Sequence, residues 1–317
     1  MTSTHDSSAP SELDVLVAGG GAAGLAAAVT LARSRRSVTV VDSGRPRNAP
    51  AEGVHALLGR EGISPADLLA AGRLEVAGYG GEVLDGEVTA VRRLGDGRFE
   101  AVLTGGAMLT ARRLLIATGL TDELPDVPGL AEHWGRSAIH CPYCHGWEVR
   151  DRSILVLGTS PNSVHQAMLF SQLSADMTFL EETGRGPGLE ADQTRMLAAR
   201  GIPVVTGEVA GVESGVQDGE SRLTGMRLAG GELLPAEVVV VATRMLANTA
   251  VFEPLGLRTE ENPMGRFLTV DAFGRTSVPG VSAAGNASDL SAQVGAAAAA
   301  GTMAGAQLNA ELVMEGL

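Results

Sequence analysis

The sequence predicts an α/β protein with two doubly wound domains, because two similar strand–helix–strand units lie about 140 residues apart. The first unit is an apolar strand, an alanine-rich helix and a second strand, at Leu13–Ala18, through Arg33, and at Ser37–Asp42. The second unit has the same order, at Ser153–Gly158, Ser163–Leu173 and Met177–Leu180. Strands that alternate with helices form parallel sheets, so the pattern indicates a duplicated domain plan.

Each unit is followed by segments of another kind. In the first copy, apolar and polar residues alternate between Gly-Asp and Gly-Gly turns, which predicts an antiparallel meander over 86–94, 98–103 and 108–112. A separate buried strand is expected over Arg113–Gly119. The second copy has short segments at 205–211, 224–228 and 232–233 before a strand over Glu237–Arg244. We therefore expect two Rossmann-like nucleotide-binding domains, each with three layers of the ββα type.

The last part of the chain is expected to rejoin the first domain. It reads as a strand over Gly280–Asn286 and a helix from about Gln293 to the C-terminus. The expected division is a discontinuous first domain, residues 13–122 with 246–317, and a second domain, residues 123–245. Residues 1–12 are polar and lack the basic start and apolar core of a signal peptide, which predicts a disordered tail on a cytoplasmic protein.

Composition excludes several classes of function. The formal net charge is −13, which argues against nucleic acid or an anionic membrane surface as a partner. Every basic residue is arginine, so Schiff-base chemistry and a lysine-dependent phosphate loop are both excluded. No stretch has the length and composition of a transmembrane helix.

A glycine motif links the first predicted strand to the first predicted helix. Gly19-Gly20-Gly21-Ala22-Ala23-Gly24 fits G-x-G-x-x-G, in which the glycines allow a tight turn, close approach of a pyrophosphate, and helix–strand packing. Asp42 ends the second strand, where an acid accepts hydrogen bonds from an adenosine ribose. The motif therefore predicts dinucleotide binding.

The only two cysteines, Cys141 and Cys144, are three residues apart. A Cys-x-x-Cys pair can close on itself and exchange with external thiols, so we interpret it as a redox pair. Two other interpretations stay open: a zinc site completed by His140 and His145, and unreactive thiols. Adjacent residues rarely wrap one tetrahedral ion, which disfavours zinc and predicts no metal.

The glycine motif, Asp42, Ala117-Thr118-Gly119, the cysteine pair and Ala284-Gly285-Asn286 together resemble the low-molecular-weight thioredoxin reductase family of flavoproteins. The resemblance covers Asp14 to nearly the end of the chain. It implies FAD in the first domain and the cysteine pair in the second domain against the flavin. Cys144 is then the flavin-facing thiol, and Cys141 is the interchange thiol that meets substrate.

The same resemblance implies a set of cofactor-binding residues. They are Gly19, Gly21, Ala22, Ala23, Gly24, Asp42, Arg47, Asn48, His55, Val88, Ala117, Thr118, Gly119, Gly285, Asn286, Gln293 and Val294. Asn286 stands where the family has aspartate, so it keeps a hydrogen-bonding group without the charge.

The second nucleotide-binding motif departs from the family. Where the reductases have G-x-G-x-x-A, this chain has Gly158-Thr159-Ser160-Pro161-Asn162-Ser163, in which Ser160 adds a side chain and Pro161 removes an N–H donor. Glu181 and Glu182 replace the cations that hold the 2′-phosphate, and Arg185 is a single nearby cation. We therefore expect that NADPH binding is lost.

Without a nicotinamide site, electrons are expected to enter from substrate thiols. The motif Cys-Pro-Tyr-Cys-His-Gly-Trp-Glu is similar to that of the dithiol oxidases that form the disulfides of holomycin and gliotoxin. This resemblance implies an FAD-dependent oxidase that closes a disulfide in a small-molecule dithiol, with O2 giving H2O2, and a homodimer. His140 is the first candidate for the base that deprotonates the substrate, oriented by Asp289, and His145 is the competing candidate.

Two alternatives stay open. One is a reductase that uses NADPH or another donor to reduce a thioredoxin-like protein. The other is a flavin-binding redox sensor that reports the state of Cys141 and Cys144 without turnover.

Overall fold

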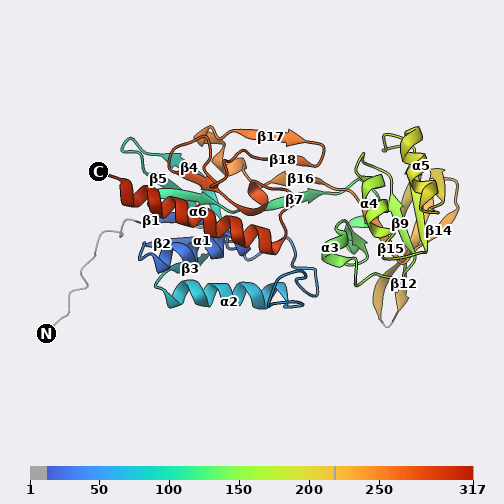
Figure 1. The fold of residues 1–317 in the computed structure, drawn as a ribbon, viewed down its shortest axis with the longest axis horizontal. Helices are drawn as coiled ribbons and strands as arrows, with labels where there is room; N and C mark the ends of the chain where they lie inside the picture. The colour runs from blue at the N-terminus through green and yellow to red at the C-terminus, as the bar shows by residue number, and fades with distance from the viewer. Residues whose placement is uncertain (1–12, 218, 317) are drawn as a thin grey trace.

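The structure is a computed structural model that describes residues 13–217 and 219–316. Two α/β bodies lie along the long axis of the molecule and are joined by two strands, β7 (Leu120–Glu123) and β16 (Arg244–Ala247) (Figure 1). The predicted disordered tail, residues 1–12, lies outside the described residues. The two α/β bodies confirm the predicted fold class.

The first body contains the glycine motif. Its sheet has the strand order β3-β2-β1-β6-β5-β4, and β19 also pairs with β6. The strands are β1 (Leu13–Ala18), β2 (Val38–Asp42), β3 (Glu82–Asp85), β4 (Val88–Arg93), β5 (Phe99–Leu103), β6 (Met108–Ile116) and β19 (Val281–Ala283). The helices are α1 (Ala22–Arg33), α2 (Pro65–Gly78) and α6 (Val294–Met314), with 3-10 turns at Ala250–Leu255 and Gly285–Ala287. The C-terminal segment thus rejoins the first sheet.

β6 corrects one prediction, because the expected strands over 108–112 and Arg113–Gly119 form one strand that ends at Ile116. Its first half pairs antiparallel with β5, and its second half lies parallel between β1 and β19. A single strand therefore passes from the meander into the parallel sheet. Apolar periodicity predicts each half but carries no sign of the change of partner.

The second body contains the cysteine motif. Its parallel sheet has the order β11-β10-β9-β15-β8, covered on one side by the three-stranded sheet β12-β13-β14. The strands are β8 (Ala138–Ile139), β9 (Ile154–Leu157), β10 (Met177–Glu182), β11 (Val204–Gly207), β12 (Val209–Gln217), β13 (Glu220–Leu228), β14 (Leu233–Pro235) and β15 (Val238–Val241). The helices are α3 (Pro142–His145), α4 (Ser163–Phe170) and α5 (Ala191–Ala199), and a 3-10 turn spans Leu130–His133.

The strand expected over Glu237–Arg244 is also wrong as a single element. β15 ends at Val241, where it pairs parallel with β9, and β16 begins at Arg244, where it pairs antiparallel with β7. The break at residues 242–243 directs the chain out of the second body and back to the first.

β7 and β16 form the connection between the bodies. They pair antiparallel with Asp122 opposite Met245 and Glu123 opposite Arg244. β18 (Gly265–Leu268) and β17 (Thr259–Asn262) extend this ribbon to four strands. The domain boundaries that we propose from the sequence, 122/123 and 245/246, fall within the two paired strands.

α2 is a helix that the expectations from the sequence did not include. Ser64 caps it by accepting a hydrogen bond from the Asp67 N–H at 3.0 Å, and Pro65 occupies its first position. These start signals are present in the sequence. Only Pro65 and Val76 of this helix are buried, so its apolar periodicity is weak.

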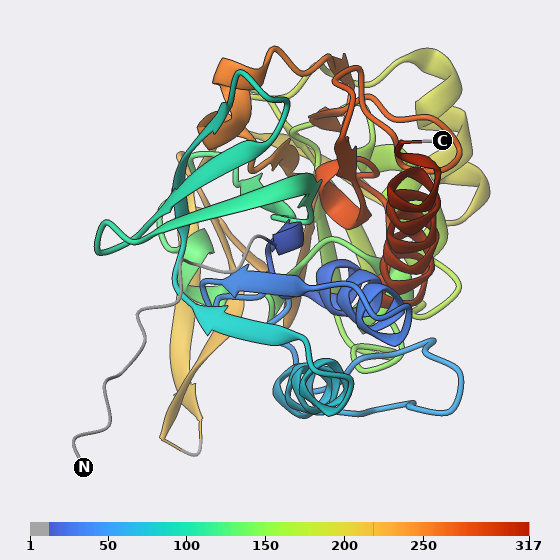
Figure 2. The same cartoon turned by 90° about the vertical axis from the view of Figure 1, so that its left-hand side faces the viewer.

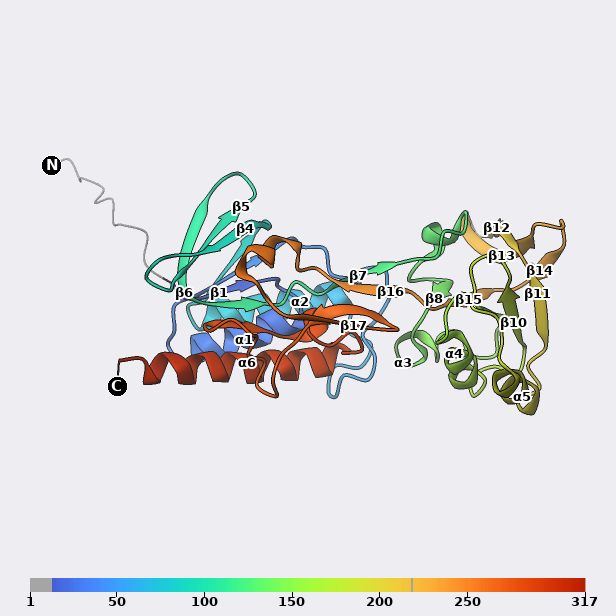
Figure 3. The ribbon, with the colours of Figure 1, turned by 90° about the horizontal axis from the view of Figure 1, so that it is seen from above.

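Helices α6, α1 and α2 lie side by side along one face of the first sheet, and β4 and β5 lie on the opposite side (Figures 2 and 3). The contact between α1 and α6 depends on glycine. A Cβ at Gly301 would lie 2.0 Å from the carbonyl oxygen of Ala23, and one at Gly305 would lie 2.8 Å from that of Ala27. The two backbones therefore touch, which fixes α1 and the glycine loop before it.

Within the two described ranges, no helix combines the length and apolar character that crossing a membrane requires.

Replacing Gly301 with Ala is expected to destabilise the first body, because the new methyl group meets main-chain atoms that cannot rotate away. The expected loss is about 1–3 kcal/mol of unfolding free energy, the range for overpacked sites, measured by urea denaturation. Gly295→Ala in the same helix is the matched control, since its Cβ would meet only Leu57 Cδ1 at 3.7 Å. An equal or greater stability of Gly301→Ala would contradict the close contact.

Candidate active site

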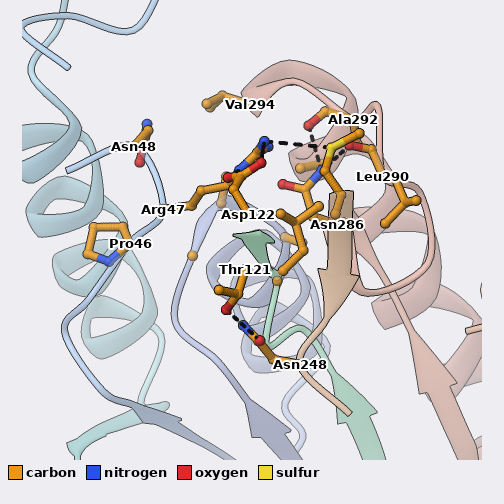
Figure 4. A pocket seen from close by; sticks show the side chains of 18 of the residues that line it. Pro46, Arg47, Asn48, Thr121, Asp122, Asn248, Asn286, Leu290, Ala292 and Val294 are labelled. Carbon is orange, nitrogen blue, oxygen red and sulfur yellow. Dashed lines mark hydrogen bonds and ion pairs between the residues drawn. The ribbon is translucent and has the colours of Figure 1, made fainter. Parts of the chain in front are cut away.

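A cavity of about 1330 Å³ lies between the two bodies, and Figure 4 shows part of its lining. The glycine loop, parts of residues 45–55 and residues 117–122 after β6 line it from the first body, and the cysteine motif and α4 line it from the second. Ordinary small-molecule pockets measure about 300–1,000 Å³. The cavity therefore has room for a dinucleotide cofactor together with a small substrate.

The glycine loop fits the diphosphate of FAD. Gly19 has φ of +104°, and a Cβ there would lie 2.3 Å from the carbonyl oxygen of Ala117, so only glycine fits. Gly21 precedes α1 and provides no side-chain cap, and a Cβ added to it would meet no protein atom within 4 Å. The helix N-terminus therefore faces open space in the cavity, where free N–H groups can bind phosphate.

Asp42 is held by partners on both sides. Its carboxylate accepts a hydrogen bond from the Gly20 N–H at 3.1 Å and forms an ion pair with Arg73 of α2. Arg73 also donates to Asp85 at 2.8 Å. Arg73 was not among the residues expected from the sequence, because its role depends on the packing of α2 beside β2 and β3. The arginine fixes the carboxylate that we expect to bind the adenosine ribose.

Asn286 holds the loop before α6 through its side-chain amide, which explains why asparagine stands here in place of the aspartate of the family. Its Nδ2 donates to the carbonyl oxygens of Ala292 at 3.0 Å and Leu290 at 3.4 Å (Figure 4). It also donates to the carbonyl oxygen of Asp289 at 3.0 Å. A carboxylate has no such donor, so aspartate could not hold the loop before α6 in this way. The expected contact of Asn286 with the cofactor stays a prediction.

Most of the predicted cofactor-binding residues face the cavity. Those that line it are Gly19, Gly21, Ala22, Ala23, Asp42, Arg47, Asn48, His55, Val88, Ala117, Thr118, Gly119, Gly285, Asn286, Gln293 and Val294. Gly24 does not, because it packs α1 on β1: a Cβ there would lie 1.9 Å from the Gly19 oxygen. His55 Nδ1 also pairs with Glu61 Oε1 at 2.7 Å.

Thr118 and Thr121, at the exit from the first sheet, are tied to Asn248 after β16. Thr118 Oγ1 donates to the Asn248 carbonyl oxygen at 2.7 Å, and Asn248 Nδ2 donates to the Thr118 carbonyl oxygen at 3.1 Å. Thr121 Oγ1 donates to Asn248 Oδ1 at 2.9 Å (Figure 4). These bonds fix the outgoing strand to the returning strand beside the cavity.

Cys141 and Cys144 form a disulfide that lines the same cavity as the glycine loop. Their Cα atoms are 5.3 Å apart, with Cys141 at the N-cap of the one-turn helix α3 and Cys144 within it. Both side chains are partly exposed, so a thiol that enters the cavity can reach them. The fold therefore brings the predicted redox pair to the predicted cofactor site.

His140 precedes the disulfide and also lines the cavity. Its ring stacks on Trp134 with centroids 5.6 Å apart, and its Nε2 lies 3.3 Å from Arg47 Nη2. Burial, the positive charge of Arg47 and the proximity of His145 lower the pKa of His140 to about 4, although Asp122 acts in the opposite direction. The imidazole is therefore neutral near pH 7 and able to accept a proton.

The expected contact between Asp289 and His140 does not form in this structure. The Asp289 carboxylate instead accepts hydrogen bonds from the N–H and hydroxyl of Ser291, at 2.9 and 2.7 Å. Asp289 is also outside the lining of the cavity. The carboxylate near His140 belongs to Asp122, which no local motif marks as functional.

His145 stays a candidate base. It lines the cavity, and neither of its ring nitrogens has a hydrogen-bond partner among the described residues. Burial lowers the pKa of His145, against the opposing charge of Glu148. It is thus a second largely neutral imidazole near the disulfide.

The loop at residues 158–163, which corresponds to the second nucleotide-binding motif, is closed by hydrogen bonds between its own residues. The Asn162 N–H donates to Ser160 Oγ at 3.2 Å, and the Ser160 N–H donates to Ser163 Oγ at 3.3 Å. A Cβ at Gly186 would lie 2.1 Å from the Gly158 oxygen, so residue 186 sits directly on the loop. The cavity at this place measures only about 10 Å³.

Glu181 and Glu182, which follow this loop on β10, already accept hydrogen bonds from other protein groups. Glu182 is fully buried and accepts hydrogen bonds from Arg185 Nη1 at 2.9 Å and the Val209 N–H at 3.1 Å. Glu181 accepts from the Leu189 N–H at 2.9 Å and from Thr206 Oγ1 at 2.9 Å. Arg185, the one cation considered for a 2′-phosphate, is therefore engaged by a buried carboxylate.

Comparisons with known proteins identify the family of this chain. A profile of the family described as pyridine nucleotide-disulphide oxidoreductase matches residues 13–304. Thioredoxin reductase sirT of Leptosphaeria maculans is 31% identical over 313 residues, covering 95% of this chain and 94% of its own. Thioredoxin reductase tcpT of Claviceps purpurea is 29% identical over 312 residues, covering 96% and 95%.

Two solved structures have the same fold over nearly the whole chain. The crystal structure of HlmI has a TM-score of 0.87 and 44% identity, covering 95% of this chain and 93% of its own. An oxidoreductase from Agrobacterium tumefaciens has a TM-score of 0.87 and 33% identity, covering 96% and 99%.

Replacing Gly21 with Ala is expected to weaken FAD binding at least about tenfold, because the methyl group enters the space where a helix N-terminus binds phosphate. The apoprotein should keep its stability, since the methyl group meets no protein atom. FAD affinity is measured by fluorescence titration of the apoprotein, and stability by urea denaturation. Gly24→Ala, which forces a methyl group against the Gly19 oxygen, should instead lower the stability of the apoprotein. Unchanged FAD affinity in Gly21→Ala would place the diphosphate elsewhere.

Proposed function

Because the chain belongs to the pyridine nucleotide-disulphide oxidoreductase family, as a flavin-dependent oxidoreductase acting on sulfur groups, we propose that it oxidises a small-molecule dithiol to a disulfide with O2 as terminal acceptor. The observation that carries this proposal is the closed second nucleotide loop beside an accessible disulfide. Without a place for NADPH, substrate thiols are the electron source that this geometry favours.

The thiol steps need only the disulfide and a base. A substrate thiolate attacks Cys141 Sγ, which breaks the Cys141–Cys144 bond and releases Cys144 as a thiolate. The second substrate thiolate then attacks the substrate sulfur of the mixed disulfide, closing the product disulfide and releasing Cys141. The substrate loses two electrons and two protons, and the cysteine pair gains the two electrons.

A base is needed because an ordinary thiol has a pKa of about 8.5. We assign this role to His140, which is neutral near pH 7 and adjoins Cys141. His145, with two unpartnered ring nitrogens, is the second candidate. The chemistry that FAD supplies when bound is two-electron transfer from the reduced cysteine pair to O2, with H2O2 as the second product.

The place of the disulfide favours a small substrate. Cys141 and Cys144 line an inter-body cavity, and Tyr143 lines it too, with 63% of its surface exposed; Trp147, 66% exposed, follows in the sequence. Aromatic side chains of this kind can cover an apolar metabolite. The native dithiol is thus expected to enter the cavity beside these rings.

The named relatives support a second candidate function. sirT and tcpT are both called thioredoxin reductases, so reduction of a thioredoxin-like protein with NADPH is the alternative. The closed loop and the ion pair of Arg185 with the buried Glu182 argue against it. A sensor that cycles its disulfide without turnover is the third candidate.

Anaerobic mixing with NADPH is expected to leave the absorbance of the oxidised flavin, at about 450 nm, unchanged, because the second nucleotide loop offers no open site for it. Reduced dithiothreitol should bleach the flavin, since a thiol can reach the disulfide in the cavity. In air, dithiothreitol should consume O2 catalytically with one H2O2 formed per disulfide. Rapid bleaching by NADPH would favour the reductase, and a single turnover without sustained O2 uptake would favour the sensor.

Cys144→Ser is the control for this experiment. It leaves Cys141 as a single thiol with no disulfide for dithiothreitol to reduce, so bleaching by dithiothreitol should be lost. Full activity in Cys144→Ser would remove the cysteine pair from the electron path.

We also propose that the protein is a cytoplasmic homodimer. The outward face of α6 is exposed yet apolar, with Ala296, Ala299, Ala300, Met303, Ala306 and Ala310. Such a face is suited to pack against the same helix of a second copy.

A cysteine pair that cycles between thiol and disulfide is also suited to the reducing cytoplasm, and cell fractionation would test this location.

Sedimentation velocity of the holoprotein is expected to show a dimer, and Met303→Glu should shift it toward monomer, because a charge would enter the apolar face. Gln307→Glu, a partly buried polar position on the same helix, is the comparison variant. A monomer at all concentrations would contradict the proposal.

A further inference from the structure

His140, which follows β8, meets charged groups from two other segments. Arg47 comes from the loop after β2, and Asp122 comes from β7. Arg47 Nε and Nη2 donate to the two carboxylate oxygens of Asp122 at 2.6 and 2.8 Å. The same Nη2 lies 3.3 Å from His140 Nε2, so the guanidinium joins the carboxylate to the imidazole.

Asp122 is fixed more firmly than a surface ion pair would be. Its side chain is only 4% exposed, and Thr243 Oγ1 donates to its Oδ1 at 2.7 Å. Burial raises the pKa of Asp122, but the hydrogen bonds and charge of Arg47 and the bond from Thr243 outweigh this, so the pKa is below its usual value. The carboxylate is therefore charged and has little freedom to turn.

The contact selects one form of the imidazole. A guanidinium has donors only, so the His140 Nε2 that faces it must supply a lone pair, and the proton of the neutral ring is on Nδ1. The basic nitrogen of His140 is thus identified as Nε2. It is held beside a fixed cation until it accepts a proton.

We propose that Asp122 and Arg47 are the positioning residues of His140: Asp122 orients the guanidinium, and the guanidinium holds Nε2 of His140 unprotonated next to the cysteine pair. This assigns to Asp122 and Arg47 the part that the sequence suggested for Asp289. The role of His140 as a base rests on the proposed function, whereas the form and orientation of its ring do not.

The charged groups that face His140 determine in which direction each substitution should shift its pKa. They are Arg47 and Asp122 from the first body and the linker, and His145 from α3, while the Trp134 ring stacks without charge. Removing the Arg47 charge takes away a cause that lowers the pKa of His140. Removing Asp122 releases the guanidinium from its two carboxylate bonds.

The test is NMR of the oxidised holoprotein with its histidine rings labelled with nitrogen-15, which reports the pKa and the tautomer of each ring. The protein has six histidines to assign. Arg47→Gln is expected to raise the pKa of His140 above its value of about 4, and Arg47→Lys should keep it low because the charge remains. Asp122→Asn should abolish the preference for the Nδ1–H tautomer, seen as convergence of the two ring nitrogen shifts. A purely structural role would change neither signal in a folded variant.

Asp289→Asn separates the two candidate carboxylates. It should leave both the pKa and the tautomer of His140 as in the unmodified protein, since the Asp289 carboxylate bonds Ser291 and not His140 among the described residues. If Asp289→Asn changes these signals and Asp122→Asn does not, the proposal is wrong. If Arg47→Gln leaves the pKa unmoved, it is equally wrong.

A kinetic readout tests the link to turnover separately. When dithiothreitol reduces the cysteine pair, Arg47→Gln should lose rate as the pH falls through the raised pKa of His140, because the protonated ring cannot act as a base. The unmodified protein should show no such loss above about pH 5. NMR signals that move as expected without this loss of rate would keep the positioning proposal and overturn the assignment of His140 as base.

Discussion

The antiparallel pairing of β7 with β16 is the contact on which the rest of the site depends. It is the place where the chain leaves the first body and returns to it, with Asp122 opposite Met245. Because both strands are main-chain bonded to each other, Asp122 on one and Thr243 before the other stay within hydrogen-bond distance, at 2.7 Å. Arg47 then docks on this fixed carboxylate, and His140 docks on Arg47.

The local motifs were predictable, and the long-range partners were not. The glycine motif and the cysteine pair could be read from the sequence because each is a short segment whose spacing reflects its own chemistry. Strand ends were less predictable: β6 changes partners midway, and residues 242–243 leave one sheet for another. Arg73 and Asp122 gave no signal, since each acts through a residue at least 30 positions away.

The second body retains a role even though its nucleotide loop is closed. Gln166 of α4, the helix that follows this loop, donates to the carbonyl oxygen of His140 at 2.8 Å and to that of Val241 at 3.4 Å. One side chain thus holds the ends of β8 and β15 together, immediately before the cysteine motif and before Thr243. In the proposed function, the domain that would bind a nucleotide in a reductase supports the segment that carries His140 and the disulfide.

The low pKa of His140 restricts how it can act. A thiol has a pKa of about 8.5 and the His140 imidazole a pKa of about 4, a difference of roughly 4–5 units. Complete transfer of the proton from the thiol to the imidazole, before the sulfur attacks, would therefore cost about 6 kcal/mol of free energy. A free thiolate formed in advance would therefore be rare. Proton removal that accompanies attack of the sulfur on Cys141 avoids this intermediate. The negative charge of Asp122 favours the imidazolium as it forms, and the positive charge of Arg47, the larger of the two effects, opposes it. The arrangement thus suits a base that is neutral at rest and charged only while the disulfide bond is breaking.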